Sequence, residues 1–254
     1  MCLILVAWRV HPDYPLVVAA NRDEYHVRPT APAGYWPEHP DILAGRDLQG
    51  GGTWLGVSRS GRFSALTNFR SPDHLKPAGP SRGGLVSGFL TGTDSASAYL
   101  AAVEPDAFRY SGFNLLVCDG ATLGWLNNVD GHRRLLTPGI YGLSNALLDT
   151  PWPKVEQSKS ALARALHALP DWQALFHLLW DDTTYPNDRL PRTGVDPEFE
   201  RLLSAAFIRN PDYGTRSSTV LIEDARGRRL FMEQGWLPSG EPGERRQFEL
   251  PGPT

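Results

Sequence analysis

Apolar and polar positions along this chain show two patterns of spacing, one typical of strands and one typical of helices. Short runs of β-branched and aliphatic residues, bounded by turn residues, predict strands. These runs cover residues 2–8, 16–20, 53–58, 63–68, 113–118, 122–127, 134–136, 140–144, 217–223 and 230–234. Apolar residues three and four positions apart predict helices over residues 81–89, 95–103, 154–169, 172–180 and 198–208.

The order of these elements predicts the fold class. Strands gather toward both ends and helices lie in two central blocks, so strands and helices do not alternate one by one. We therefore expect an α+β fold of antiparallel sheets with helices on their outer faces, in one domain over residues 1–254. Residues 29–53 are rich in proline and glycine and predict an ordered loop, and the stretch after Gly235 predicts a surface tail with a short strand at most.

Composition excludes several classes of function. The 254 residues carry 25 Lys and Arg against 28 Asp and Glu, which leaves no basic surplus for binding nucleic acid. No segment approaches the roughly 18–20 apolar residues of a membrane helix, and the first residues lack the pattern of a secretory signal. The two cysteines and seven histidines show no metal-site spacing. We expect a protein of the reducing cytoplasm with neither a metal nor a cofactor.

Cys2 is the first candidate for chemistry. Removal of Met1, which is common before a small residue, would place a thiol and a free α-amine on Cys2. An α-amine has a pKa of about 7.7–8.0, so it can act as a general base near neutral pH. A thiol becomes a good nucleophile where a positive charge lowers its pKa. The alternative interpretation is that Cys2 is one more apolar residue of a strand.

The polar end of the second predicted strand adds weight to the catalytic interpretation. Side chains alternate between the two faces of a strand, so Asn21 and Asp23 share one face, and Arg22 and Glu24 share the other. Asp23, on a strand paired with the first, is placed to orient the α-amine of Cys2. The alternative is a charged hairpin end without a catalytic role.

Cys2 and Asn21-Arg22-Asp23-Glu24 together resemble the signature of the NRDE family, also called the transport and Golgi organization protein 2 family. Four further blocks agree with this resemblance, which runs from residue 2 to about 220. They are Gly51-Gly52-Thr53-Trp54-Leu55-Gly56, Thr67-Asn68-Phe69-Arg70, Gly142-Leu143-Ser144-Asn145 with Pro151-Trp152-Pro153-Lys154, and Thr215-Arg216-Ser217-Ser218.

The resemblance implies an αββα sandwich of two antiparallel sheets, similar to the cysteine N-terminal-nucleophile (Ntn) hydrolases such as penicillin V acylase and bile salt hydrolase. In such enzymes the N-terminal cysteine attacks an amide carbonyl. Carried over to this chain, the resemblance implies that Cys2 is the nucleophile, that Asp23 holds its amine, and that Asn68 and Asn145 bind the oxyanion. It also implies that Arg216 tunes the thiolate or holds a substrate carboxylate.

This chain departs from the acylase pattern at one position. Acylases place an arginine directly before the Asn-x-Asp sequence, whereas this chain has Ala20 there. Arg22 lies inside the motif and faces away from Asp23 by strand alternation. We assign Asn21, Arg22, Trp54 and Trp152 to substrate binding, although plain packing is an equally simple role for the two tryptophans.

Two functions follow from the sequence. The first is a cysteine Ntn hydrolase that cleaves an amide, or a thioester, of a small acylated molecule. The second is a non-catalytic binding or trafficking protein on the same scaffold, with haem or an acylated lipid as its ligand. Ser144 within Gly-x-Ser-x-Ala resembles a nucleophile elbow, but Pro151 and Pro153 interrupt the required turn into a helix. Gly50–Gly52 lacks the Lys-Ser/Thr of a phosphate-binding loop.

Overall fold

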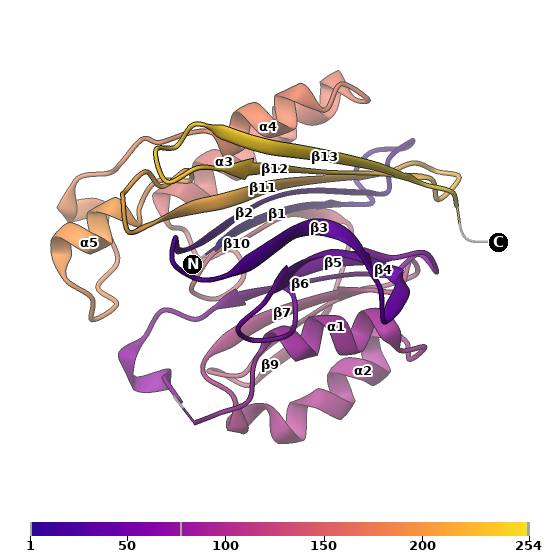
Figure 1. The fold of residues 1–254 in the computed structure, drawn as a ribbon, viewed down its shortest axis with the longest axis horizontal. Coiled ribbons are helices and arrows are strands. Elements are labelled where there is room, and N and C mark those ends of the chain that lie inside the picture. The colour runs from indigo at the N-terminus through magenta and orange to yellow at the C-terminus, as the bar shows by residue number, and fades with distance from the viewer. Residues whose placement is uncertain (1, 77, 253–254) are drawn as a thin grey trace. The chain divides into compact units, whose positions relative to one another are not determined.

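The computed structural model describes residues 2–76 and 78–252 (Figure 1). Contacts between Cα atoms divide the chain into two compact units. The first comprises Met1–Val27, Arg70–Pro72 and Pro138–Leu250, and the second comprises Arg28–Phe69, Asp73–Thr137 and Pro251–Thr254. Each unit is built on one antiparallel sheet, which confirms the expected α+β class with two antiparallel sheets. The assignment of residues 1–254 to a single domain stays a prediction.

The first unit contains a six-stranded sheet in the order β10-β1-β2-β11-β12-β13. Its strands are β1 (Cys2–Trp8), β2 (Leu16–Tyr25), β10 (Gly139–Leu143), β11 (Tyr213–Glu223), β12 (Arg229–Trp236) and β13 (Pro242–Leu250). The two N-terminal strands lie inside the sheet and are buried over nearly their whole length. The N-terminal end of the chain is thereby held between hydrogen-bonded neighbours on both sides.

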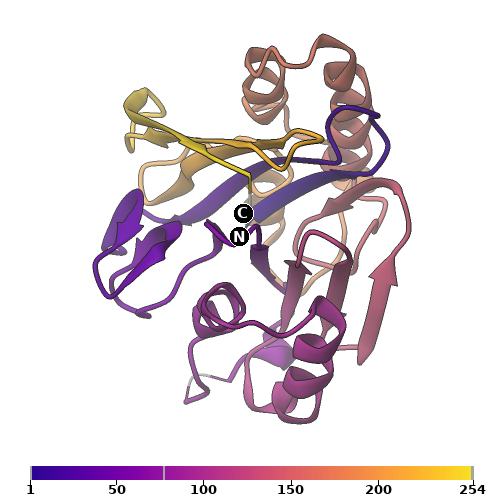
Figure 2. The same ribbon diagram turned by 90° about the vertical axis from the view of Figure 1, so that its right-hand side faces the viewer.

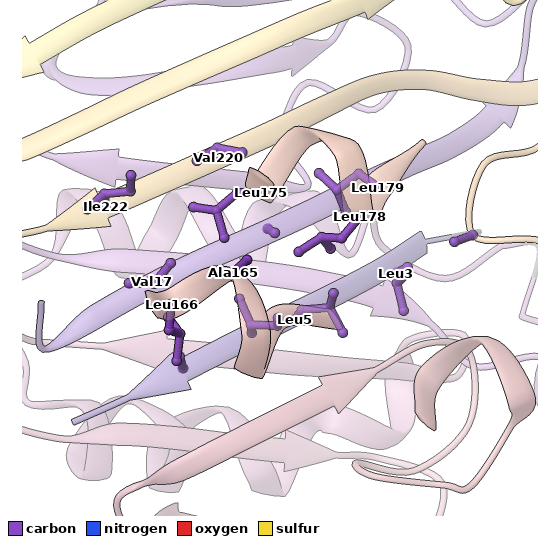
Figure 3. Packing of buried hydrophobic residues seen from close by; sticks show 14 of the residues in the cluster. Leu3, Leu5, Val17, Ala165, Leu166, Leu175, Leu178, Leu179, Val220 and Ile222 are labelled. Carbon is purple, nitrogen blue, oxygen red and sulfur yellow. The ribbon is translucent and has the colours of Figure 1, made fainter. Parts of the chain in front are cut away.

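Helices cover one face of this sheet. They are α3 (Pro153–Ala165), η3 (Leu166–Ala168) and α4 (Gln173–Leu179), and the same unit holds η4 (Asn187–Arg189) and α5 (Pro197–Leu202). Leu3, Leu5 and Val17 from the strands belong to one buried cluster with Leu175 and Leu179 of α4 (Figure 3). The salmon-coloured ribbon of these helices lies along the sheet in Figure 2. Each such buried aliphatic side chain contributes roughly 1.5–3 kcal/mol. The odd-numbered positions of β1 therefore face the helices.

The second unit contains a seven-stranded sheet in the order β3-β4-β5-β6-β7-β8-β9. Its strands are β3 (Thr30–Trp36), β4 (His39–Asp47), β5 (Leu55–Ser58), β6 (Phe63–Asn68), β7 (Phe113–Cys118), β8 (Leu123–Asn127) and β9 (His132–Leu136). The helices α1 (Gly83–Thr91) and α2 (Ala96–Val103) pack on this sheet, and the short helices η1 (Pro72–His74) and η2 (Glu104–Arg109) flank them in the chain. Phe89 and Leu100 anchor their apolar cluster.

A network of uncharged polar side chains is buried in the second sheet. The Asn114 amide donates to Thr67 Oγ1 at 3.1 Å and accepts from Trp125 Nε1 at 3.2 Å and Asn127 Nδ2 at 2.9 Å. Asn127 Oδ1 in turn accepts the backbone N–H groups of Val129 and of the residue after it. The network ties β6, β7 and β8 to the turn that follows β8.

Three sequence-based expectations about local structure are wrong. Residues 29–53 form two strands, β3 and β4, rather than a loop, because Pro32 occupies an exposed position beside a register shift of the edge strand β3. The C-terminal stretch forms the nine-residue edge strand β13, whose alternating charged side chains face solvent. The helix expected over residues 198–208 ends at Leu202, because residues 203–208 form a buried turn instead.

Candidate active site

Strand pairing places the polar end of β2, residues 21–23, beside Cys2. Cys2 lies directly opposite Arg22, and Leu3 lies opposite Asn21. Directly opposed residues of an antiparallel pair project to the same face. The thiol of Cys2 therefore shares a face with Arg22, whereas Asn21 and Asp23 project to the face that the helices cover, as alternation predicts.

The backbone of Cys2 is held by the loop that follows β10. The Cys2 backbone N–H donates to Asn145 Oδ1 at 3.4 Å, and the Cys2 carbonyl accepts from Ser144 Oγ at 3.0 Å. Ser144 Oγ also lies 3.3 Å from Asn145 Oδ1, and both side chains are buried. The Asn145 carbonyl is tied down by the Arg70 backbone N–H at 2.7 Å. A side-chain oxygen thus faces the nitrogen that becomes the α-amine of Cys2 once Met1, which lies outside the described residues, is removed.

Asp23 is buried on the helix-facing side, where only 2% of its surface is exposed. Its Oδ1 accepts from Thr215 Oγ1 at 2.8 Å, and its backbone carbonyl accepts from the Tyr213 hydroxyl at 3.1 Å. Both partners come from β11, which pairs with β2. The carboxyl group is consequently fixed in orientation by a neighbouring strand.

The buried turn at residues 203–208 forms the wall beside Asp23. Lys154 Nζ donates to the carbonyl of Leu203 at 2.8 Å and lies 3.4 Å from that of Ala205. Asn21 Nδ2 donates to the carbonyl of Ala206 at 2.8 Å, and also to that of Leu179. Thr215 Oγ1 accepts the backbone N–H of Ile208 at 2.9 Å. These side chains supply the hydrogen bonds that a continuing helix would have made internally, which is why α5 ends early.

The hydrogen bonds of the Asn21 side chain indicate a structural role. Its Oδ1 accepts from Ser218 Oγ at 2.6 Å while its Nδ2 makes the two bonds to carbonyls, and only 1% of the residue is exposed. A contact with substrate would require these bonds to break. We propose that Asn21 holds the site together in place of the substrate-binding role assigned from the sequence.

A buried group of charges adjoins the same wall. The Arg70 guanidinium pairs with the Glu200 carboxylate, with about 5% of each side chain exposed, and Thr193 Oγ1 donates to the same carboxylate at 2.6 Å. Arg70 also stacks over the Trp152 ring at 4.7 Å. Lys154 completes the group, since it lines one small, partly open cavity with Arg70, Glu200 and Trp152.

Burial shifts the ionisation of this group. Desolvation raises the pKa of Asp23, although the positive charges of Lys154 and Arg70 oppose the rise. Desolvation and the charge of Arg70 lower the pKa of Lys154 to about 8, against the attraction of Asp23, Cys2 and Glu200. The pKa of Tyr213 is also raised by burial. Perturbed groups that perturb one another are typical of functional sites.

The face that carries the thiol has a different character. Ser217 lies opposite Arg22 on β11, and a register shift leaves Arg216 as the extra residue of a bulge. Arg216 Nη1 donates to the Tyr25 carbonyl at 2.8 Å, and its pKa is lowered by burial and by nearby Arg22. The Ser217 hydroxyl is buried and has no hydrogen-bond partner among residues 2–76 and 78–252.

The pKa of the Cys2 thiol is raised, mainly because the half-buried side chain is desolvated. The negative charge of Asp23 adds to this rise, and the guanidinium of Arg22 opposes it. A reactive thiolate at neutral pH therefore needs a proton acceptor or a positive charge beside it.

The remaining predicted residues lie in other places. Asn68 ends β6 and Trp54 packs over Gly45 of β4, both in the second unit, and their roles stay predictions. Trp152 lines the small cavity of the first unit. Lys154, Arg70 and Glu200 were not among the site residues predicted from the sequence. The signal for the first two was present, because Arg70 and Lys154 each end one of the quoted motif blocks.

No group of three or more His, Cys, Asp or Glu side chains is arranged to hold a metal ion in residues 2–76 and 78–252. Within the same residues, the helices are all too short or too polar to cross a membrane.

Comparison with known proteins gives concordant results. The sequence model of the family described as Transport and Golgi organisation 2 matches residues 1–238. The Transport and Golgi organization protein 2 homologs of Bos taurus and Homo sapiens are 37% and 36% identical, over 94% and 93% of this chain and 94% of theirs. The protein of that name from Drosophila melanogaster is 28% identical over 95% of each chain.

A solved structure is similar in fold. The crystal structure of a mutant conjugated bile acid hydrolase from Clostridium perfringens superposes with a TM-score of 0.54, covering 98% of this chain and 92% of that one at 8% identity. This likeness confirms the predicted Ntn hydrolase type of fold, and at this identity it concerns the fold alone.

Proposed function

Because the chain belongs to the Transport and Golgi organisation 2 family and has the fold of an Ntn hydrolase, we propose that it is a cysteine Ntn hydrolase. Its substrate would be a small acylated molecule, and the bond cleaved would be an amide or a thioester. The reaction would require removal of Met1, so that Cys2 carries both the nucleophile and the base.

One observation carries this proposal. The backbone nitrogen of Cys2 points at Asn145 Oδ1, and the neighbouring carbonyl is held by Ser144 Oγ. A strand residue would normally direct these groups only to backbone partners. Two side chains dedicated to the backbone of residue 2 make sense when its nitrogen must be held in a defined orientation. Asp23, which lies on the adjacent strand β2 and is held by Thr215 Oγ1, carries a negative charge that acts on Cys2.

The steps follow from these groups. The neutral α-amine takes the thiol proton of Cys2, and the thiolate attacks the acyl carbonyl to form a tetrahedral intermediate. The resulting α-ammonium gives its proton to the leaving nitrogen or sulfur, which departs as the free amine or thiol. Water then attacks the thioester carbonyl of Cys2 and gives one proton to the α-amine. The second tetrahedral intermediate collapses with cleavage of its C–S bond, the carboxylic acid leaves, and the α-ammonium returns its proton to the Cys2 thiolate.

Asparagine amides fit the charge that develops in both steps. One hydrogen-bond donor to an oxyanion is worth about 2.7–4 kcal/mol. Asn145 remains our candidate for this role through its Nδ2, while its Oδ1 holds the amine. Asn68 is the second candidate, on the strength of the resemblance alone. Arg22 would favour the thiolate, because it lies directly opposite Cys2.

A second function has one observation in its favour. The raised pKa of the Cys2 thiol describes a protonated, poorly nucleophilic sulfur. A non-catalytic protein that binds a ligand such as haem or an acylated lipid on the same scaffold would have no need of a thiolate. This alternative predicts that Met1 is retained, since a blocked nitrogen cannot serve as a base.

The test combines intact mass with turnover. We expect the purified protein to lack Met1, to be alkylated by iodoacetamide at Cys2 near neutral pH, and to cleave at least one member of a panel of acyl amides and acyl thioesters. Cys2→Ala should fold normally and lower turnover at least about 10³-fold, because loss of a nucleophile removes the whole covalent route. Cys118→Ala is the matched control, since Cys118 is buried in the second unit. Turnover that survives in Cys2→Ala would reject the proposal.

A further inference from the structure

Lys154 is buried at the start of α3, with 3% of its surface exposed. Burying an ammonium group without compensation is costly, so its surroundings should explain it. Its hydrogen bonds to the carbonyls of Leu203 and Ala205 satisfy part of its capacity. An ammonium group has three donors, and two neutral carbonyls do not balance its charge.

The helix face of the sheet supplies the missing negative charge. Val155, next to Lys154, belongs to the same buried cluster as Leu3, and α3 packs against β1. Asp23 projects to this face, and the turn at residues 203–208 is held by Lys154 on one side and by Thr215, the partner of Asp23, on the other. The carboxyl of Asp23 and the ammonium of Lys154 thus share one wall.

The charges that face Lys154 come from four other segments. They are Asp23 of β2, Cys2 of β1, Glu200 of α5 and Arg70. Glu200 is paired with Arg70 and accepts from Thr193, so those two charges largely offset each other. Tyr213 of β11 faces Asp23 as a neutral hydroxyl. Of the two cationic side chains that act on Asp23, Lys154 is the one that is not paired with Glu200.

We propose that Lys154 is a positioning residue of the reaction, whose buried ammonium keeps Asp23 ionised so that this carboxylate can hold the α-amine of Cys2. This inference rests on the proposed function.

A lysine in this role makes the site sensitive to alkaline pH in a way that arginine would not. The pKa of Lys154 is about 8, so the ammonium loses its proton just above neutral pH. The pKa of Asp23 then rises further, so fewer Asp23 side chains carry the charge that holds the amine than with a permanent cation at position 154. An arginine at position 154 stays charged throughout this range.

The experiment is the pH profile of kcat/KM and of Cys2 alkylation in three variants. In the unmodified protein both rates should rise toward pH 8 and kcat/KM should fall above it. Lys154→Arg should shift the falling limb upward by at least one pH unit, and Lys154→Met should lower kcat/KM at least tenfold at pH 7.5. Lys159→Met is the control, because Lys159 lies on the same helix but pairs with Asp149 near the surface.

The outcomes separate the inference from the proposed function. An unchanged falling limb in Lys154→Arg overturns the role of Lys154 even if Cys2 proves essential. Absence of any turnover that depends on Cys2 overturns the proposed function itself. Should Lys154→Met fail to fold, a ¹³C NMR titration of the Lys154 side chain decides, because Asp23→Asn must lower its midpoint, and an unmoved midpoint contradicts the pairing.

Discussion

The two units of the molecule bury polar side chains in opposite ways. In the second unit, Asn114, Asn127 and Thr67 form an uncharged network. In the first unit, Asp23, Lys154, Arg70 and Glu200 bring full charges into the interior, and burial shifts several of their pKa values.

The contrast distinguishes buried polar groups that stabilise the fold from buried charges that, in our proposal, serve catalysis. Neutral amides hold strands and turns together at little electrostatic cost when their hydrogen bonds are made. Buried charges cost several kcal/mol each in desolvation, and replacing a whole ion pair by apolar residues is often neutral or stabilising. A chain that retains such charges beside its candidate nucleophile therefore has a reason other than stability to keep them, and catalysis is that reason in our proposal.

The largest effect should come from breaking the buried ion pair. Arg70→Met leaves Glu200 buried with Thr193 as its remaining donor and removes the stacking on Trp152. We expect a loss of about 3–5 kcal/mol in the free energy of unfolding, measured by urea denaturation. The double variant Arg70→Met/Glu200→Met should recover much of this loss. The control is Arg228→Ala, which breaks the exposed pair with Asp224 and should cost less than about 1 kcal/mol.

Equal losses in the single and the double variants would contradict this prediction. That result would mean that Arg70 stabilises the first unit through packing. The unpaired charge of Glu200 would then not be the cause of the lost stability, and the two interiors would not differ in the energy of their buried charges.

The next effect concerns how the free energy of unfolding depends on pH in the alkaline range. Only the first unit, which holds the buried charges, should show it. The pKa of Lys154 is about 8 in the folded protein, against 10.5 for an ordinary lysine. Between pH 8 and pH 10.5 the unfolded chain binds more protons than the folded protein. The buried charge of Lys154 therefore destabilises the fold fully below pH 8, and this destabilisation disappears as the pH rises to 10.5. Its loss raises the free energy of unfolding by about 3 kcal/mol.

The measurement compares the pH dependence of the unfolding free energy in the unmodified protein and in Lys154→Met. The comparison is needed because the raised pKa values of Cys2 and Tyr213 make stability fall over the same range. The difference between the two curves should change by about 3 kcal/mol from pH 8 to pH 10.5. A flat difference would show that Lys154 titrates like an exposed lysine.

A smaller effect is expected in the uncharged network. Asn127→Leu removes the acceptor of the Val129 and Asp130 N–H groups and two donors of its own. We expect a loss of about 1–3 kcal/mol in the free energy of unfolding. Since none of these partners ionises between pH 5 and pH 9, the loss should be the same across that range. A loss that varies with pH would mean that this network also contains a titrating group.

These two interiors also differ in how far the sequence predicts them. Strand periodicity places Asn21 and Asp23 on one face of the second strand and Arg22 on the other, and the pairing of β2 with its neighbours agrees with that placement. The buried charges were missed because Lys154, Arg70 and Glu200 meet only through the tertiary structure, and none has a local pattern that marks it as buried. The turn at residues 203–208 was predicted as helix for the same reason, since side chains from distant segments satisfy its backbone.

The smallest effect concerns the thiol side of the first sheet, where Ser217 lies in the row of Cys2 and Arg22. A buried hydroxyl without a partner among the described residues costs about 1–3 kcal/mol, so Ser217→Ala should raise the free energy of unfolding by about 1 kcal/mol. If the row binds substrate, the same variant should raise KM while kcat changes little. Ser64→Ala is the control, because the Ser64 hydroxyl donates to a carbonyl at 2.9 Å and its loss should destabilise. If Ser217→Ala lowers the free energy of unfolding, the hydroxyl already makes a stabilising interaction in the folded protein. The inference that the row of Cys2, Arg22 and Ser217 binds a ligand would then be contradicted.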